Sequence, residues 1–298
     1  MFRIILVPLD GSRFAEAALP LAFSLSRKTK ANVHLLTVQE LLPTIVSEEW
    51  TRAASEWHGK YLDGLVPAAR AASNGKISTR LRSGHVVEEI QAEVAERNAD
   101  LVVMATHGRG GISGIWMGNT ADSFIRHADG PVILVRPQEE EDHDLGAEWS
   151  PSRILVTLDG TGESEEVLDH ALYIGGLFDA RFLLLRVIPL PKGFKSSYPP
   201  HLIRMNREAS DAAMEEASRY LDHHAEKLRN QGHAVDVDVV EAGQAGHGIL
   251  TKAEEAGCDL IAMSTHGRGR IAKTLLGSTA DKVVRGARIP VLLFRPGA

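Results

Sequence analysis

The sequence predicts two doubly wound α/β domains in tandem, and three observations lead to this fold class. The chain has 298 residues, too many for one typical domain and sufficient for two of roughly 150 residues each. An internal repeat covers most of its length. Within each repeat, short apolar runs alternate with helical patterns, which is typical of parallel sheets covered by helices.

The repeat is seen in three pairs of segments. ILVPLDGS at 5–12 returns as ILVTLDGT at 154–161, an offset of 149 residues. THGRG at 106–110 returns at 265–269, and GNTAD at 118–122 returns as GSTAD at 277–281, both at an offset of 159. Such self-similarity identifies the architecture before any single element does. The change of offset places ten additional residues in the second copy, in the proline-rich stretch 190–199.

An acidic segment separates the two copies. Residues 139–144 read EEEDHD, and a block of like charge is usually a solvated linker. We therefore expect a first domain at 1–138, an acidic linker at 139–151 and a second domain at 152–298.

The elements of the first copy follow from its apolar spacing. The run 2–9 ends at Asp10-Gly11-Ser12 and predicts a strand followed by a turn, and 13–28 has alanine and leucine at helical spacing. The remaining predicted elements are a strand at 33–38, a helix at 47–73 broken near Gly64 or Pro67, a strand at 76–82, a helix at 86–98, a strand at 100–105, a loop at 106–117, a short helix from Gly118 and a strand at 132–136.

The second copy repeats this order, with strands expected near 153–158, 181–187, 234–240, 259–264 and 290–295. Residues 101–105 are apolar throughout, as expected of a parallel strand covered on both faces. Each copy therefore predicts a five-stranded parallel sheet. Ligands of such sheets bind beyond the strand carboxyl ends, where the strand order reverses.

Composition limits the classes of partner. The formal net charge is −6, which does not favour nucleic acid or an anionic membrane, and no apolar run approaches the roughly 20 residues of a membrane helix. The single cysteine, Cys258, precedes an apolar run and is expected to be a small buried residue rather than a nucleophile. We expect a cytoplasmic protein that binds neither nucleic acid nor membrane.

The loop after each fourth strand contains the strongest functional signal. Thr106-His107-Gly108 is followed, after nine residues, by Gly118-Asn119-Thr120, and Thr265-His266-Gly267 by Gly277-Ser278-Thr279. Glycine allows close backbone approach, and a helix N-terminus offers free N–H groups. The pattern predicts a phosphate cradle in which the Gly277 N–H faces a phosphate. The alternative is a long loop with a Ser/Thr cap on each short helix, which Asp122 and Asp281 also fit. The duplication of the loop favours the phosphate site.

On these motifs the chain resembles a tandem universal stress protein over nearly its whole length. The resemblance implies a Rossmann-like, adenine nucleotide alpha hydrolase-like fold whose loop, Gly-x-x-Gly-x(9)-Gly-Ser/Thr, holds ATP phosphates. It implies adenosine contacts by Asp10 and Asp159 and adenine contacts by Val38 and Val187. It also implies that the two fifth strands face each other about a pseudo-two-fold axis within the chain, and a homodimer is possible.

The sequence departs from the family pattern at three positions. The first glycine is Ala105 in copy one and Ser264 in copy two, and Asn119 stands where the pattern has Ser or Thr. We therefore expect the second copy to be the stronger ATP site, with the inserted residues 190–199 forming a lid near it. The expected nucleotide-binding residues are Asp10, Val38, Ala105, His107, Gly108, Arg109, Gly118, Asn119, Thr120, Asp159, Val187, Ser264, His266, Gly267, Arg268, Gly277, Ser278 and Thr279.

The remaining polar residues suggest binding rather than catalysis. His107 and His266 are interpreted as loop histidines bonded to backbone, and Arg109 and Arg268 either contact phosphate or are solvated. No Walker lysine or His-Glu-x-x-His motif occurs, so Mg²⁺ is expected to be held through the phosphates. The leading hypothesis is an ATP-binding stress-response regulator with an unidentified protein partner. The alternatives are a slow ATPase or nucleotidyl transferase on the same fold, or a scaffold with one or both sites empty.

Overall fold

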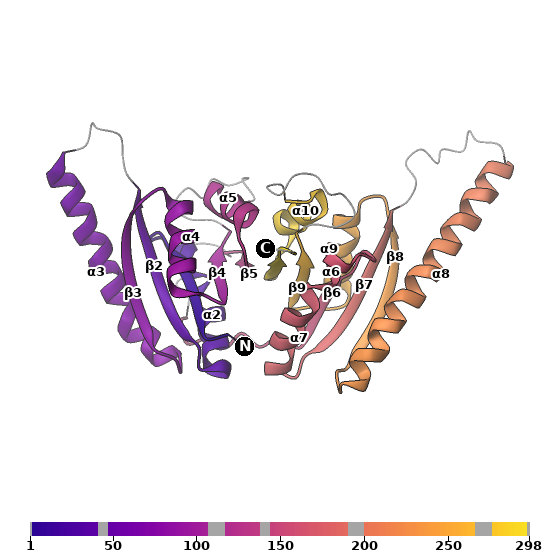
Figure 1. Ribbon diagram of the computed structural model, residues 1–298, viewed down its shortest axis with the longest axis horizontal. Helices are drawn as coiled ribbons and strands as arrows, with labels where there is room; N and C mark the ends of the chain where they lie inside the picture. Colours follow the sequence, from indigo (N-terminus) through magenta and orange to yellow (C-terminus); the bar gives the residue numbers. More distant parts are fainter. Residues whose placement is uncertain are drawn as a thin grey trace. The chain divides into compact units, whose positions relative to one another are not determined.

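The computed structural model describes residues 2–40, 47–106, 117–137, 144–189, 200–265 and 276–296 (Figure 1). The chain divides into two compact units, unit 1 at Met1–Ser150 and unit 2 at Pro151–Gly297. Strands alternate with helices in both, and the described pairings within each unit are parallel. The predicted doubly wound α/β class is confirmed for both copies.

Unit 1 has a sheet in the order β3-β2-β1-β4-β5. The strand order reverses between β1 and β4, so the crevice expected of such sheets opens beyond the carboxyl ends of these two strands. Its elements are β1 (Ile4–Leu9), α1 (Arg13–Glu16), α2 (Leu19–Thr29), β2 (Asn32–Glu40), α3 (Glu48–Ala72), β3 (Ile77–Gly84), α4 (Val86–Arg97), β4 (Leu101–Ala105), α5 (Asn119–His127) and β5 (Val132–Val135).

Unit 2 repeats the topology in the order β8-β7-β6-β9-β10, with its reversal between β6 and β9. Its elements are β6 (Arg153–Thr157), α6 (Gly162–Glu165), α7 (Val167–Leu177), β7 (Arg181–Pro189), α8 (Pro200–Asn230), β8 (Val235–Ala242), α9 (Ala245–Glu255), β9 (Leu260–Ser264), α10 (Ser278–Gly286) and β10 (Val291–Phe294). The expected packing of the two fifth strands about a pseudo-two-fold axis stays a prediction.

Helices cover both faces of each sheet. On β2, the His34 ring contacts Glu93 of α4, whereas Gln39 donates to the carbonyl of Thr51 in α3. Residues of opposite parity on a strand point to opposite faces, so α3 and α4 lie on opposite sides of the sheet. On β7, the Arg186 side chain lies over Tyr220 of α8, whereas Gly248 of α9 lies against Val187. The two units therefore have the same layering.

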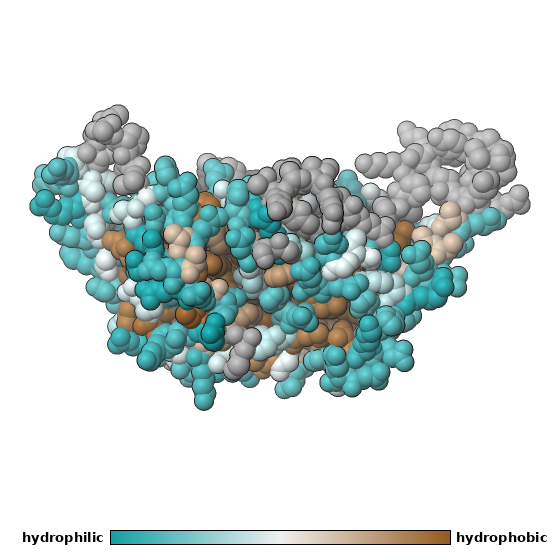
Figure 2. Space-filling model, viewed as in Figure 1, coloured by the Kyte–Doolittle hydropathy of each residue, from teal (hydrophilic) through white to brown (hydrophobic). Residues whose placement is uncertain are grey.

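The core of each unit lies along its central strands. Every residue of β4 and of β9 is buried, and Leu6, Val7 and Leu155 are completely inaccessible. Burying one such side chain contributes roughly 1.5–3 kcal/mol. The outward surface of α8 is largely hydrophilic (Figure 2), as expected of a helix that covers one face of a sheet. No helix in the described part of the chain is long and apolar enough to cross a membrane.

The predicted break in the long helix of copy one is wrong. α3 continues through Gly64 and Pro67 without interruption. Pro67 is exposed, so water can bind the Asp63 carbonyl that the missing proline N–H leaves without a helical donor. On the other side of the helix Leu62, Ala69 and Ala72 are buried. Tertiary packing outweighs the local cost of the proline.

Candidate functional site

The aspartates after the first strands have the same geometry in both units. Asp10 Oδ1 accepts from the Ser12 N–H at 2.9 Å and from Ser12 Oγ at 2.6 Å. Asp159 Oδ1 accepts from the Thr161 N–H at 3.0 Å and from Thr161 Oγ1 at 2.6 Å. Each carboxylate thereby folds the turn that leads into α1 or α6. Both aspartates are half-buried and lie at the carboxyl end of a strand beside the topological reversal.

The loop glycines close onto the preceding strand ends. The Gly118 N–H donates to the Thr106 carbonyl at 2.7 Å, and the Gly277 N–H donates to the Thr265 carbonyl at 3.0 Å. The expectation that the Gly277 N–H faces a phosphate is therefore wrong. The glycine is needed for another reason: a Cβ at Gly277 would lie 2.9 Å from the Thr265 carbonyl oxygen.

The N–H groups beyond these glycines begin α5 and α10. Gly118 and Gly277 are the N-cap residues, and neither helix has a side-chain cap from the described residues. The alternative of a Ser/Thr cap is therefore not what the structure contains. In unit 2 the first-turn donors belong to Ser278, Thr279 and Ala280, which have no acceptor within the helix. Ser278 is exposed and Thr279 half-buried, as are their counterparts Asn119 and Thr120.

The acidic residues of the first turns pair with arginines on the same helix. Arg126 Nε and Nη2 donate to the two carboxylate oxygens of Asp122 at 2.9 and 2.8 Å. Arg285 Nε donates to Asp281 Oδ1 at 2.9 Å. These pairs fix the carboxylates along the helix surface one turn from its start, where they also complement the helix dipole.

The residues that replace the family's first glycine are both buried. Ala105 ends β4 and Ser264 ends β9, and each is 8% exposed. Ser264 Oγ donates to the Glu163 carbonyl at 2.7 Å, which links β9 to α6. The Ser264 hydroxyl is thus bonded to protein backbone. Val38 and Val187 are half-buried near the carboxyl ends of β2 and β7, opposite Arg82 and Val240 in the ladder.

Several predicted residues lie outside the described part of the chain. These are His107, Gly108, Arg109, His266, Gly267 and Arg268 of the two loops, the inserted stretch 190–199 and residues 139–143 of the acidic linker. Cys258 is 5% exposed, and burial raises the pKa of its thiol to about 11. The interpretation of Cys258 as a buried structural residue is confirmed.

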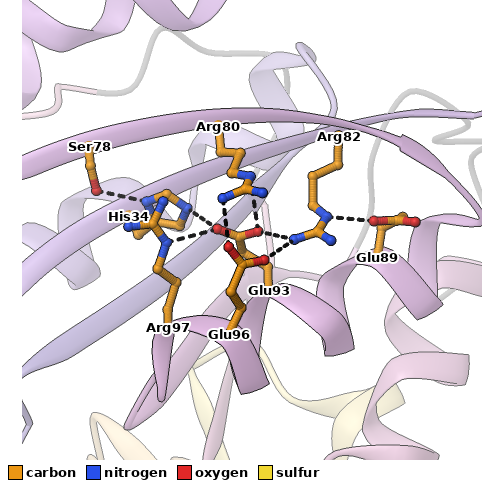
Figure 3. A network of polar contacts seen from close by, with 8 residues as sticks. All are labelled: His34, Ser78, Arg80, Arg82, Glu89, Glu93, Glu96 and Arg97. Carbon is orange, nitrogen blue, oxygen red and sulfur yellow. Dashed lines mark hydrogen bonds and ion pairs between the residues drawn. The ribbon is translucent and has the colours of Figure 1, made fainter.

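A charged network in unit 1 was not expected from the sequence (Figure 3). Glu93 of α4 has no exposed side-chain surface and accepts from His34 Nε2 at 2.8 Å, from Arg97 Nε at 3.0 Å and from Arg82. His34 Nδ1 contacts Ser78 Oγ at 2.7 Å. Arg80 and Glu96 extend the network towards solvent.

The network sets the protonation of its buried members. Burial would raise the pKa of Glu93, but hydrogen bonds from Arg82 and Arg97 outweigh it and hold the pKa below its usual value. Burial and the Arg97 charge lower the pKa of His34. Unit 2 has Leu183 and Lys252 at the matching positions, so the network belongs to unit 1 alone.

The fold and the two loops define a class: tandem doubly wound α/β proteins with a glycine-closed loop at each strand reversal. The universal stress protein family model matches residues 1–136 and 151–295. The chain therefore belongs to the universal stress protein family, with one such domain in each half.

One relative of tandem length supports this assignment, and one solved structure of tandem length shares the fold. A universal stress protein of Mycolicibacterium smegmatis is 28% identical over 310 residues, covering 98% of this chain and 97% of that protein. The crystal structure of a universal stress protein from Archaeoglobus fulgidus covers all of both chains with a TM-score of 0.76 at 20% identity. A universal stress protein solved in complex with cAMP matches 45% of this chain and 97% of that one, with a TM-score of 0.38 at 20% identity.

Proposed function

We propose that the chain binds ATP, with Mg²⁺ held by the nucleotide phosphates, and that occupancy controls binding of a protein partner in a stress response. The observation that carries the proposal is the start of α5 and of α10, where first-turn N–H groups have no side-chain cap from the described residues. A helix N-terminus of this kind favours an anion because its partial positive charge and free donors converge there.

The neighbouring groups fit the rest of a nucleotide. Both helices follow loops that leave the sheet at the end of β4 or β9, adjacent to the first strand of the unit. Asp10 and Asp159 lie at the end of that first strand, and Val38 and Val187 lie near the end of the next. In this proposal the phosphates lie at the start of the helix and the adenosine lies over Asp10 or Asp159. The nucleotide would then lie along the carboxyl ends of adjacent strands of one sheet.

Unit 2 is proposed to be the stronger site. Ser278 opens α10 with a hydroxyl that can donate to a phosphate oxygen, whereas Asn119 occupies that position on α5. Both side chains are exposed, so the difference lies in their chemistry and not in their access.

Replacing Ser278 with proline tests the phosphate site. Proline at the first helical position removes one N–H but is compatible with the helix, and the preceding residue, Gly277, already has the extended backbone that proline requires (φ −58°, ψ 145°). We expect Ser278→Pro to weaken Mg·ATP binding by tenfold or more in calorimetric titration of the full chain. Ser278→Ala keeps the N–H and should lose less.

Circular dichroism and urea unfolding serve as controls for the fold of both variants. Unchanged affinity in a folded Ser278→Pro variant would contradict the phosphate site. Single-turnover assays with γ-labelled ATP on the same preparations distinguish binding from hydrolysis, since a regulator that senses occupancy should retain intact ATP.

A further inference from the structure

A pocket in unit 1 lies between α3 and the turn after β1. Its volume is about 510 Å³, within the usual range for small-molecule sites, roughly 300–1,000 Å³. No lysine, arginine, aspartate or glutamate is among the residues that line it, so the lining is largely apolar and aromatic. The lining residues are Gly11, Ser12, Trp50, Ala53, Ala54, Trp57 and His58.

This pocket adjoins the proposed adenosine contacts on two sides. Ser12, part of the lining, donates both its N–H and its hydroxyl to the Asp10 carboxylate. The first turn of α3 is held at the carboxyl end of β2, because Gln39, next to Val38, donates to the Thr51 carbonyl at 3.1 Å. The pocket therefore continues the strand edge along which the nucleotide is proposed to lie.

Two indoles on one face of α3 contribute to the lining. Trp50 and Trp57 are the exposed large hydrophobic side chains of the described residues, at 50% and 47%. They are two helical turns apart, about 10 Å along the helix axis, and the small residues Ala53 and Ala54 lie between them. Small residues between two large aromatic ones leave room for a flat ring against the indoles.

The Trp57 ring is fixed by its neighbours. It stacks nearly parallel to Tyr61, with ring centres 5.9 Å apart and 5° between the planes, and meets the His58 ring edge to face at 5.0 Å. Tyr61 in turn donates to Glu16 Oε1 at 2.9 Å, which ties α3 to α1. The indole is therefore ordered before a ligand arrives, and this lowers the entropic cost of binding.

Unit 2 has other side chains at both tryptophan positions. Ala209 and Glu216 stand there in the repeat, whereas Ala212 and Ala213 keep the two alanines of the first copy. Ala209 and Glu216 are exposed, as the tryptophans are. The aromatic surface is therefore specific to unit 1, although the four positions have the same surroundings in the helix.

The turn after the first strand also differs between the units. The Arg186 side chain on β7 is 6% exposed, and its guanidinium lies against Gly160, where a Cβ would be 3.0 Å from the guanidinium carbon. The counterpart of Gly160 in unit 1 is Gly11, which lines the pocket. Unit 2 thus packs a protein side chain against a glycine whose counterpart in unit 1 faces a ligand-sized pocket.

We propose, on the basis of the nucleotide function proposed above, that the base of the nucleotide in unit 1 lies against Trp50 and Trp57. Unit 1 then recognises its ligand mainly by the base, and unit 2 mainly by the phosphates. A purine has flat faces that stack on an indole, whereas the lining has no lysine or arginine for a phosphate. The start of each short helix fits this division, since Asn119 on α5 lacks the hydroxyl that Ser278 gives α10.

AMP and ribose 5-phosphate test the base requirement, because only AMP carries the adenine. Both are titrated into the full-length Ser278→Pro variant, in which phosphate binding by unit 2 is weakened, and followed by calorimetry and tryptophan fluorescence. We expect AMP to bind about tenfold or more tightly than ribose 5-phosphate and to quench the fluorescence. Equal affinities for the two ligands would overturn the assignment.

Variants of α3 in the same background locate the base. The double variant Trp50→Ala/Trp57→Glu copies unit 2 and should lower AMP affinity by about fivefold or more, with ribose 5-phosphate unaffected. Trp57→Phe keeps an aromatic face, so it should retain most of the affinity while reducing the quenching, which a purely structural role of Trp57 would not produce. Ala68→Glu adds the same charge at an exposed position of α3 outside the lining and should change neither.

The base contact and the phosphate site can fail separately. If Ser278→Pro leaves Mg·ATP affinity unchanged while the double variant loses AMP affinity, the phosphate site is wrong and the base contact stands. If Ser278→Pro weakens Mg·ATP binding but the folded double variant binds AMP as its parent does, the base contact is overturned and the phosphate site stands. Circular dichroism establishes that each variant is folded.

Discussion

The N–H of Gly277 donates to the Thr265 carbonyl oxygen, and a Cβ on Gly277 would lie 2.9 Å from that same oxygen. Gly277→Ala must therefore shift the start of α10 or the end of β9. We expect a loss of about 1–3 kcal/mol in the free energy of unfolding together with weaker ATP binding. Urea unfolding and calorimetric titration measure the two effects. Gly243→Ala is the matched control in unit 2, because a Cβ there meets nothing within 4 Å.

Asn119→Ser should strengthen ATP binding in unit 1. The change gives α5 the hydroxyl that Ser278 gives α10, at an equally exposed position. One additional hydrogen bond to a charged phosphate is worth about 1.5–3 kcal/mol, so the dissociation constant should fall by roughly tenfold or more. The measurement is made in the Ser278→Pro background, which isolates the first site. No gain would mean that the hydroxyl is not what unit 1 lacks.

Ser264→Ala should lower stability and leave nucleotide affinity unchanged. The Ser264 hydroxyl is bonded to the Glu163 carbonyl, and a hydrogen bond of this kind contributes about 0.5–1.5 kcal/mol. Ala105 already occupies the matching position in unit 1, so the backbone there accommodates alanine. Denaturant midpoints and ATP titration separate the two effects. A large change in affinity would place the hydroxyl in the nucleotide site instead.

Glu93→Ala should destabilise the protein by about 3–5 kcal/mol, because it leaves the buried His34 and three partly exposed arginines without their shared acceptor. Lys252→Ala is the control at the matching position of unit 2. Lys252 pairs with Asp238, and both side chains are partly exposed, so the expected loss is about 0–1 kcal/mol. Equal losses in the free energy of unfolding of the two variants would show that burial of the Glu93 network does not add to stability.

His34 should make stability depend on pH below about 6.5. Its pKa is lowered in the folded chain, so below the unfolded value of about 6.5 the unfolded chain binds a proton that the folded chain does not. Stability is therefore lost as pH falls, by up to about 1.4 kcal/mol per pH unit. The groups that face the His34 ring are Ser78, Arg80, Glu93 and Arg97. The variant His34→Gln removes the ring and leaves these four residues unchanged in sequence.

Urea midpoints at pH 7.5, 6.5 and 5.5 compare the wild type with His34→Gln. The lowered pKa values of His170 and His224 act equally in both proteins, so the difference between the slopes isolates His34. Identical slopes would contradict a neutral buried His34.

The strands were predictable because their signal is local. Apolar runs bounded by Asp-Gly turns gave β1 and β6, and the repeat confirmed each choice a second time. Local sequence was misleading at Pro67, where a proline suggested a break in the helix. Whether a proline ends a helix depends on whether its face of the helix is exposed to solvent, and this is set by tertiary packing. The motif also singled out Gly277 without indicating its contact with the Thr265 carbonyl, because that contact joins two segments across the loop.

The Glu93 network could not be predicted from patterns within one segment. His34 lies in an apolar strand and Glu93 on a helix 59 residues away, and their contact depends on which helix covers which face. One sequence signal was nevertheless present. Where the repeat aligns Thr37 with Arg186 and Glu93 with Lys252, a change of size or charge at a buried position marks a place where the two copies differ in chemistry.

The Glu93 network also affects how the chain reaches its native state. Two similar domains synthesised in tandem are prone to mispairing of elements between copies during folding. If α4 packed on the sheet of unit 2, Glu93 would meet Leu183 and Val239 in place of His34 and Arg80 and would keep only Arg97 of its own helix as a counter-charge, at a cost of several kcal/mol. The charges on α4 therefore favour packing of this helix on the sheet of unit 1 over packing on the sheet of unit 2.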